Sequence, residues 1–142
     1  MKRPRIIGTT NEAIDECERQ LKKVLSPSFR QWLLQNNGLS IGSASLFPIF
    51  DNRDPRTTWD SIVRQFHNGQ WIPEYWDEDN TWSSYLPFGS IEADTLCFDY
   101  SSSQSNEELH IVLLSHETGA PTLIANSFSE FRQLIEGRKL KS

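Results

Sequence analysis

The stretch Thr95-Leu96-Cys97-Phe98-Asp99-Tyr100 decides the fold class. Its apolar and polar residues alternate with the two-residue period of a β-strand, which places Leu96, Phe98 and Tyr100 on one face. An apolar face of this kind has to be covered by other elements, because a single strand cannot bury it. The surrounding sequence is therefore expected to supply further strands and the elements that pack on them.

Further strands are predicted on both sides of this stretch. The β pattern begins at Tyr85. A strand over residues 110–115 has an unbroken apolar centre, from Ile111 to Leu114, which indicates burial on both faces. The turn at 117–120 follows, and residues 121–125 are expected to return as the partner of that strand.

Four helices are predicted from capping residues and from apolar residues at helical intervals. Thr9 and Glu12 have capping-box spacing at the start of a helix over residues 10–23. A second helix is expected to begin at Ser26 and to stop at the Asn-Asn-Gly of residues 36–38.

The third helix is expected to end at Asn68-Gly69, and the last to open with the capping box 127–130 and to end near Gly137, before a frayed basic tail. A short buried segment is expected over residues 46–50, before the third helix. The predicted buried stripes are Trp59, Ile62, Val63 and Phe66 in the third helix, and Phe128, Phe131, Leu134 and Ile135 in the last.

Length and composition restrict the architecture. A chain of 142 residues with 37% hydrophobic residues fits a single domain, 1–142, that buries a core without disulfides or metal. No apolar run is long enough to span a membrane, and the N-terminus lacks a secretory signal. Cys17 and Cys97 stand far apart in unrelated contexts. A cytoplasmic protein without membrane contact is therefore expected.

Charge is distributed unevenly along the chain. No Lys or Arg occurs from residue 65 to residue 131, whereas the flanks hold all 14 basic residues. Such a segment disfavours nucleic-acid binding, which needs Lys and Arg contacts to phosphate, and favours a basic protein partner. The alternative is that the acids only keep the protein soluble. The acids of the segment are Glu74, Asp77, Glu78, Asp79, Glu92, Asp94, Asp99, Glu107, Glu108, Glu117 and Glu130.

The sequence contains little evidence for a catalytic or metal-binding site. Cys97 lies inside a strand pattern, where a buried inert thiol is favoured over a nucleophile. His67, His110 and His116 are too dispersed for a zinc site, so no metal or other cofactor is predicted. A hydrolase remains an alternative if two acids of the segment converge in a pocket. Candidates for such a pair are Glu74, Asp77, Glu92, Asp94 and Asp99.

The order of elements and their joints resembles the SUKH superfamily, which includes the fungal Smi/Knr-type cell-wall regulators. Leu25–Gly38 looks like the family's start of the second helix and its Asn-Gly stop. Tyr85–Gly89, followed by Thr95–Tyr100, is similar to its Pro-Phe-Gly approach to a strand that ends in an aromatic residue and Asp. The strand at 110–115 and the lead from Ala125 into the last helix complete a match over about residues 10–137.

The resemblance implies an α+β fold, with helices packed against a mainly antiparallel sheet. Bacterial members are similar to immunity proteins, which bind and block a cognate polymorphic toxin, and fungal members look like scaffolding regulators. Neither role requires catalysis. The expected function is therefore that of a non-enzymatic immunity protein whose toxin, a nuclease for example, has a basic surface. A regulatory or scaffold module of the same family is the alternative.

The predicted partner-binding site is the aromatic and acidic segment that follows the third helix. Large rigid rings favour interface hot spots, and the neighbouring acids would steer a basic partner. The alternative is that the rings only close the core beneath a loop. The predicted partner-binding residues are Trp71, Glu74, Tyr75, Trp76, Asp77, Glu78, Asp79 and Trp82, with Asp94 and Asp99 nearby.

Overall fold

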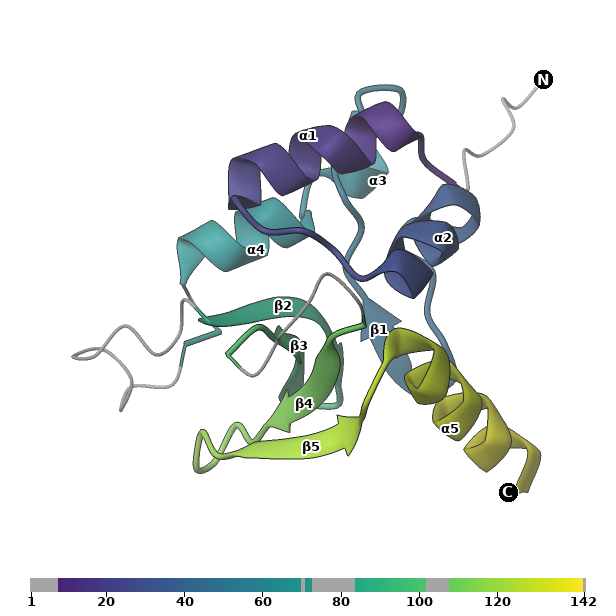
Figure 1. Cartoon of the computed structure of the whole chain (residues 1–142), viewed down its shortest axis with the longest axis vertical. Helices are drawn as coiled ribbons and strands as arrows, with labels where there is room; N and C mark the ends of the chain where they lie inside the picture. Colours follow the sequence, from purple (N-terminus) through teal and green to yellow (C-terminus); the bar gives the residue numbers. More distant parts are fainter. Residues whose placement is uncertain (1–7, 70, 73–83, 102–107, 142) are drawn as a thin grey trace.

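The protein has an α+β fold in which helices pack on an antiparallel sheet (Figure 1). The structure, a computed structural model, describes residues 8–69, 71–72, 84–101 and 108–141, and only the backbone of 137–141. The helices are α1 (Asn11–Leu21), α2 (Pro27–Asn36), α3 (Pro55–Thr58), α4 (Ile62–Asn68) and α5 (Phe128–Lys141). The strands are β1 (Ala44–Leu46), β2 (Tyr85–Ile91), β3 (Asp94–Asp99), β4 (His110–Leu114) and β5 (Pro121–Ala125). The predicted fold class is confirmed.

The sheet has the order β1-β2-β3-β4-β5, with every neighbouring pair antiparallel. β3, the stretch that decided the fold class, lies in the middle and pairs with β2 and β4. Residues Leu96 and Phe98 are fully buried on the face toward the helices, and Cys97 is fully buried on the opposite face. The predicted burial of both faces of β4 is confirmed, because Ile111 and Val112 are both buried.

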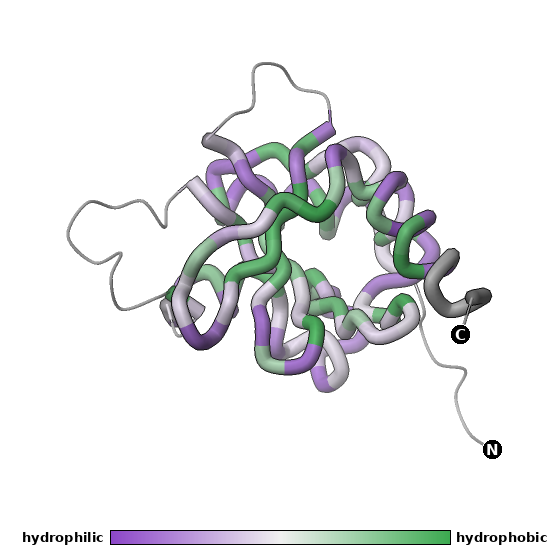
Figure 2. Tube along the Cα trace, turned by 90° about the horizontal axis from the view of Figure 1, so that it is seen from below, coloured by the Kyte–Doolittle hydropathy of each residue, from purple (hydrophilic) through white to green (hydrophobic). Residues whose placement is uncertain are grey.

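The core lies between the sheet and the helices and is built around phenylalanine rings. Phe88 on β2 stacks on Phe98 with their ring centroids 4.2 Å apart. Phe29 on α2 contacts Phe98 and Phe128 at 5.0 and 4.9 Å, so one ring joins three elements. Figure 2 shows apolar stretches through the middle of the molecule and hydrophilic stretches at peripheral turns. Among the described helices, none is long and apolar enough to cross a membrane.

Helix α1 begins one residue later than its predicted capping box. Thr10, not Thr9, is the N-cap, and its side chain accepts a hydrogen bond from the amide of Ala13. The hydroxyl of Thr9 instead donates to the buried carboxylate of Asp51 at 2.9 Å. Thr9 therefore bonds to a residue 42 positions away instead of capping the helix as the local pattern predicts.

The prediction that Trp59 is part of a buried helical stripe is wrong. Helix α4 begins only at Ile62, because Ser61 is the N-cap and accepts a hydrogen bond from the amide of Arg64. Trp59 lies before the cap and is 60% exposed. The predicted end of the helix is confirmed, since Gly69 adopts a φ of 72° as its C-cap.

The two capping residues predicted for α5 both bond at its start, although Glu130 bonds the amide before the N-cap Ser127 and not that of Ser127 itself. The hydroxyl of Ser127 accepts from the amide of Glu130 at 3.0 Å, and the Glu130 carboxylate accepts from the amide of Asn126 at 3.1 Å. Two other predictions for this helix are wrong. The helix continues through Gly137 to Lys141, and Leu134 is 48% exposed because it lies outside the stripe formed by Phe128, Phe131 and Ile135.

Candidate partner-binding surface

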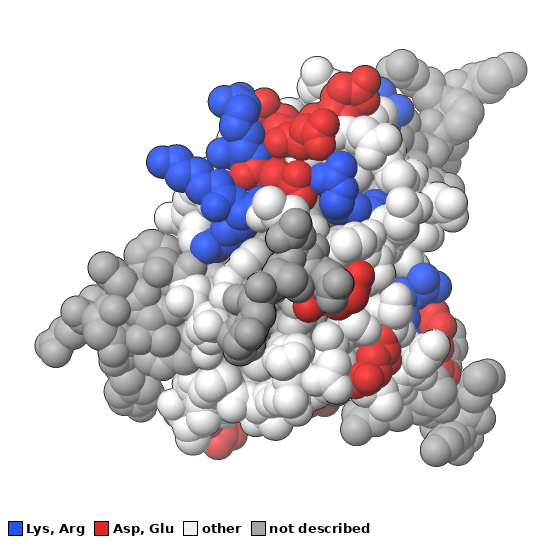
Figure 3. All heavy atoms as spheres, viewed as in Figure 1, with Lys and Arg blue, Asp and Glu red and all other residues white. Residues whose placement is uncertain are grey.

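The two halves of the molecule differ in charge. The described helical half, residues 8–69, contains seven acidic and seven basic residues. In the described sheet half, residues 84–101 and 108–136, seven acidic residues accompany one basic residue, Arg132, and α5 then continues into the basic residues Arg138, Lys139 and Lys141. In Figure 3, Lys and Arg are interspersed with Asp and Glu over α1, while the area over β4 and β5 shows only uncharged and acidic residues. The charge separation along the sequence is therefore also a separation in space.

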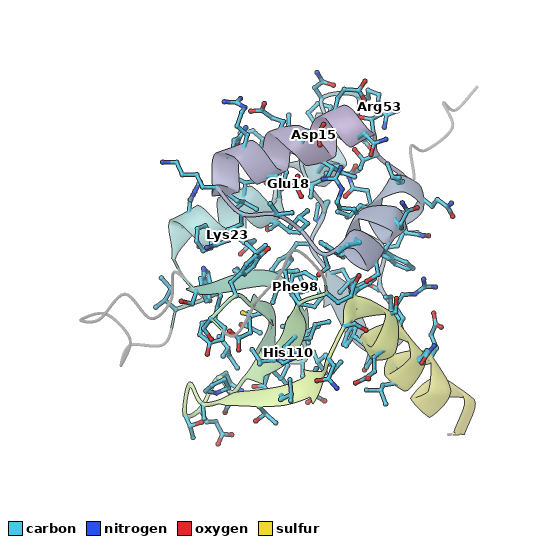
Figure 4. The ribbon with its side chains drawn as sticks, viewed as in Figure 1. Asp15, Glu18, Lys23, Arg53, Phe98 and His110 are labelled. Atoms are coloured by element: carbon cyan, nitrogen blue, oxygen red, sulfur yellow. The ribbon has the colours of Figure 1, made fainter. Side chains whose placement is uncertain are left out.

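Charges in the helical half largely neutralise one another. Arg30 on α2 forms ion pairs with Asp15 and Glu18 on α1, at 3.3 and 2.7 Å. Figure 4 labels both acidic residues. Arg53 contacts the buried Asp51 at 2.6 Å. The hydrogen bond from Arg53 outweighs the opposing effect of burial and lowers the pKa of Asp51 to about 2. This half offers paired charges rather than a single-sign surface.

In the sheet half, acidic residues gather at the ends of two neighbouring hairpins. Asp94, at the start of β3, accepts hydrogen bonds from the backbone amide of His116 at 2.9 Å and from its ring Nδ1 at 2.7 Å. Glu117 lies 3.9 Å from the other ring nitrogen of His116, and Glu92 precedes Asp94 in the β2–β3 turn. We call Glu92, Asp94, His116 and Glu117 the hairpin-end cluster.

The ring–carboxylate contact changes the pKa of both partners. The hydrogen bonds from His116 lower the pKa of Asp94, and the hydrogen bond to Asp94 raises the pKa of His116. Each shift favours the charged form of its group, so the two charges stabilise each other. Because both side chains lie at the surface, solvent screens this interaction.

The structure places the predicted site residues Asp94 and Asp99 at opposite ends of β3. The strand has six residues, so the Cα atoms of its two ends lie roughly 16 Å apart. Asp99 pairs in register with Tyr85, the first residue of β2, and its carboxylate accepts from the amide and hydroxyl of Ser101 at 2.8 and 2.6 Å. Asp94 and Asp99 therefore do not form the convergent acid pair that a hydrolase would use.

Trp71 lies at the junction of α4 and the sheet. Its indole nitrogen donates to the carbonyl of Phe66 at 3.3 Å, and the two rings stack with their centroids 6.1 Å apart. The half-buried ring packs against both core clusters, on the two faces of the sheet. Glu74, Tyr75, Trp76, Asp77, Glu78, Asp79 and Trp82 lie outside the described residues, so their predicted role stays a prediction.

The chain matches the sequence profile of a known family. The profile of the SMI1 / KNR4 family (SUKH-1) matches residues 8–133, from just before α1 into α5. The chain belongs to the SUKH-1 family. No curated protein matches this SUKH-1 chain in a direct sequence comparison.

The cysteines of this SUKH-1 domain are buried within the core. Both Cys17 and Cys97 are free thiols. Burial raises the pKa of Cys17 to about 12 and that of Cys97 well above its usual value, which makes both thiols unreactive. The prediction of a buried Cys97 is confirmed. Within the described part of the chain, no three His, Cys, Asp or Glu side chains gather as metal ligands do.

The exposure of two aromatic side chains of the SUKH-1 domain was not predicted from the sequence. Trp59 is 60% exposed, and the guanidinium of Arg64 lies 5.2 Å from its ring centroid. Phe50, expected in a buried segment, is 41% exposed, whereas its neighbour Ile49 is fully buried. A signal for Trp59 was present, because Ser61 is a favoured N-cap and excludes earlier residues from the helical stripe. No comparable local signal exists for Phe50.

Proposed function

We propose that this SUKH-1 domain is an immunity protein that binds and neutralises a cognate protein toxin without catalysing a reaction. Family membership supports a role of this type. The observation that carries the choice of partner is the charge of the described sheet half, whose strands β2 to β5 and their described turns (84–101 and 108–125) hold five acidic residues and no Lys or Arg. A toxin with a basic surface, such as the substrate cleft of a nuclease, is complementary to that half.

Three groups of residues are proposed to contribute to the interface. The hairpin-end cluster supplies acidic groups at one end of the sheet. Asp99 and the segment that contains Trp71 supply further acids and aromatic rings, the latter being the anchors that interfaces favour. The proposed site of action is the cytoplasm, where the free thiols of Cys17 and Cys97 would persist.

Co-expression with the toxin encoded by the neighbouring gene tests the proposal. Growth should be restored by the immunity protein, and the purified partners should form a complex. The association rate should fall as salt concentration rises, because complementary charge speeds the encounter and salt screens it. If no neighbouring gene encodes a toxin, and no toxin is neutralised, the proposal is wrong.

The alternative from the sequence, a scaffold or regulatory module, is distinguished by affinity capture from the native host. A regulator should retain several endogenous proteins reproducibly. An immunity protein should instead retain one secreted toxin, with a stoichiometry that size-exclusion chromatography with light scattering can determine.

A further inference from the structure

A surface pocket lies between α1 and the segment that leads from β1 to α3. Its volume is about 330 Å³. Ala13, Glu12 and Glu16 line it from α1, and Phe50 and Arg53 line it from the opposite side. We call this cavity the Phe50 pocket. It lies in the helical half of the molecule, away from the hairpin-end cluster on the sheet.

A hydrogen-bond network around Asp51 fixes the wall that carries Phe50. The Asp51 side chain is 3% exposed and accepts from the hydroxyl of Thr9 at 2.9 Å and from Arg53 Nη2 at 2.6 Å. The amide of Asp51 donates to the hydroxyl of Thr58 at 3.0 Å. Residues before α1, after Phe50 and in α3 are thereby joined. The wall is built in advance, which lowers the entropic cost of binding.

The Phe50 ring is held at the surface although an apolar core lies beside it. Ile49 enters that core and is fully buried, whereas Phe50 remains 41% exposed and lines the pocket. A partly exposed aromatic ring in a concave wall offers both an apolar surface and a π face. Such a surface suits a ligand group that is flat or aliphatic and carries a positive charge.

Charge in the pocket also favours a cation. Glu12, Glu16 and Asp51 supply three carboxylates, and Arg53 supplies the one positive charge in the lining. The Arg53 guanidinium is engaged by Asp51 and by the carbonyl of Gly8 at 3.2 Å. Arg19, at the rim, pairs with Glu16 and adds a second positive charge. Three carboxylates against two guanidinium groups leave the pocket and its rim with a net negative charge.

We propose that the Phe50 pocket binds an arginine side chain of the protein partner. The identity of the partner as a toxin rests on the proposed function, whereas the preference of the pocket for a guanidinium rests on the pocket residues. A guanidinium stacks flat on the Phe50 ring while its N–H groups reach the carboxylate of Glu12. Arginine suits the site better than lysine, because a planar fork can satisfy an aromatic face and a carboxylate together. The partner would then contact the helical half as well as the acidic sheet half.

Titration of the full chain with Nα-acetyl-arginine methylamide tests the pocket directly. Amide chemical shifts of Ala13, Asn52 and Arg53 should change saturably, with a dissociation constant in the millimolar range. The matched citrulline probe has the same shape but no charge, and it should bind at least about fivefold more weakly. Equal shifts from both probes, or shifts spread over the sheet half instead, would overturn the proposal.

Two variants separate the contributions of the ring and the charge. Phe50→Leu keeps an apolar side chain but removes the π face, and Glu12→Gln keeps the size but removes the carboxylate. Each should weaken arginine binding about three- to tenfold. Glu136→Gln on α5, which removes another exposed helical glutamate, should leave it unchanged. Unweakened binding in both pocket variants, with the fold confirmed by circular dichroism, would contradict the proposal.

The same variants connect the pocket to the toxin. If the pocket receives a toxin arginine, Phe50→Leu and Glu12→Gln should weaken the complex by a similar factor, chiefly through a faster off-rate. A toxin that is neutralised with unchanged affinity by both variants refutes the pocket as a toxin contact and leaves the proposed function intact. Binding of the arginine probe without neutralisation of any toxin refutes the proposed function instead.

Discussion

The carboxylate of Asp94 on the β2–β3 hairpin receives both the backbone amide and the ring Nδ1 of His116 on the β4–β5 turn. The two residues are 22 positions apart, so this contact ties together two hairpins that the β3–β4 connection separates. The raised pKa of His116 means that its charged form stabilises the folded state below the ordinary value of 6.5, and that this stabilisation is lost as pH rises through the folded-state pKa. The lowered pKa of Asp94 means that its contribution is present above the ordinary value of 3.8 and is lost as pH falls through the folded-state pKa.

The contact between Asp94 and His116 should therefore stabilise the protein most between about pH 4 and pH 6.5. We expect His116→Gln to lower the melting temperature more at pH 5.5 than at pH 8.5, as measured by circular dichroism. Asp94→Asn should lower the melting temperature with the same dependence on pH. The double variant should lower it little further than either single variant does. A loss of melting temperature that is the same at pH 5.5 and pH 8.5 would show that the charge on the His116 ring does not contribute to stability.

Replacing Glu92 by glycine should stabilise the β2–β3 hairpin. Glu92 occupies the first position of a two-residue turn with a φ of 54°, a conformation that suits glycine. We expect Glu92→Gly to raise the free energy of unfolding by about 0.5–1 kcal/mol in urea denaturation, since relief of strain exceeds the added entropy of the unfolded chain. Glu92→Ala removes the same charge but keeps a Cβ atom, and it should not stabilise. Equal gains from both variants would assign the effect to charge.

Gly89 should tolerate no side chain. It faces Leu46 where β2 pairs with β1, and an added Cβ would lie 2.5 Å from the backbone carbonyl oxygen of Ser45. Because that obstacle is backbone, β1 would have to move, and we expect Gly89→Ala to lower the free energy of unfolding by about 1–3 kcal/mol. Ser90→Ala, one residue further along the strand, is the matched control and should change it by less than about 0.5 kcal/mol. Comparable stability of the two variants would contradict the steric argument.

Acid should remove the contribution of Asp51 to stability. Its pKa of about 2, against an ordinary 3.8, means that the ionised form stabilises the fold above pH 4 and that this contribution is lost as pH falls toward 2. We expect Asp51→Asn to lower the free energy of unfolding by about 1–2 kcal/mol at pH 7, a figure reduced because Arg53 is partly solvent-exposed. The difference from the wild type should shrink as pH falls from 4 to 2. A difference that stays constant over this range would exclude ionisation of Asp51 as the cause.

Charge reversal should separate the proposed interface from the rest of the surface. Replacing Asp77 and Glu78 by lysine is expected to slow association with a basic toxin about tenfold at low salt, in stopped-flow or biolayer measurements. Asp60→Lys, in the neutral helical half, is the control and should change the rate far less. Unchanged association in the Asp77 and Glu78 variant, with intact circular dichroism, would move the interface away from the segment after Trp71.

Most of the helices and strands could be predicted, because capping residues and the spacing of apolar residues lie within or next to the element that they specify. Alternation identified β3, and the capping box identified the start of α5. The same reasoning failed where a distant partner decided the outcome. Thr9 bonds to Asp51, 42 residues away, and no local spacing reveals such a contact. The end of α5 was misplaced because Gly137 was read as a stop, although the helical backbone continues past it.

The candidate site was less predictable than the fold. The excess of acidic residues in the sheet half follows directly from the sequence. The separation of Asp94 from Asp99 could also be predicted, since Asp94 directly precedes the predicted strand 95–100 and Asp99 lies near its far end. The pairing of Asp94 with His116 depends on the register between β3 and β4, which only the folded sheet defines. The exposure of Phe50, in the wall of a pocket that α1 also lines, depends on the tertiary structure, and the periodicity of the sequence does not report on it.

The placement of β1 has a consequence for the order of folding. The strands β2 to β5 follow one another in sequence and pair as neighbours, whereas β1 ends at Leu46 and pairs with β2, which begins only at Tyr85. Closing this long loop costs more chain entropy than forming the hairpins does, so β1 should dock after the C-terminal meander has formed. Until then the outer edge of β2 is open to intermolecular pairing, and native-state hydrogen exchange should show the amides of β1 opening at lower free energy than those of β3.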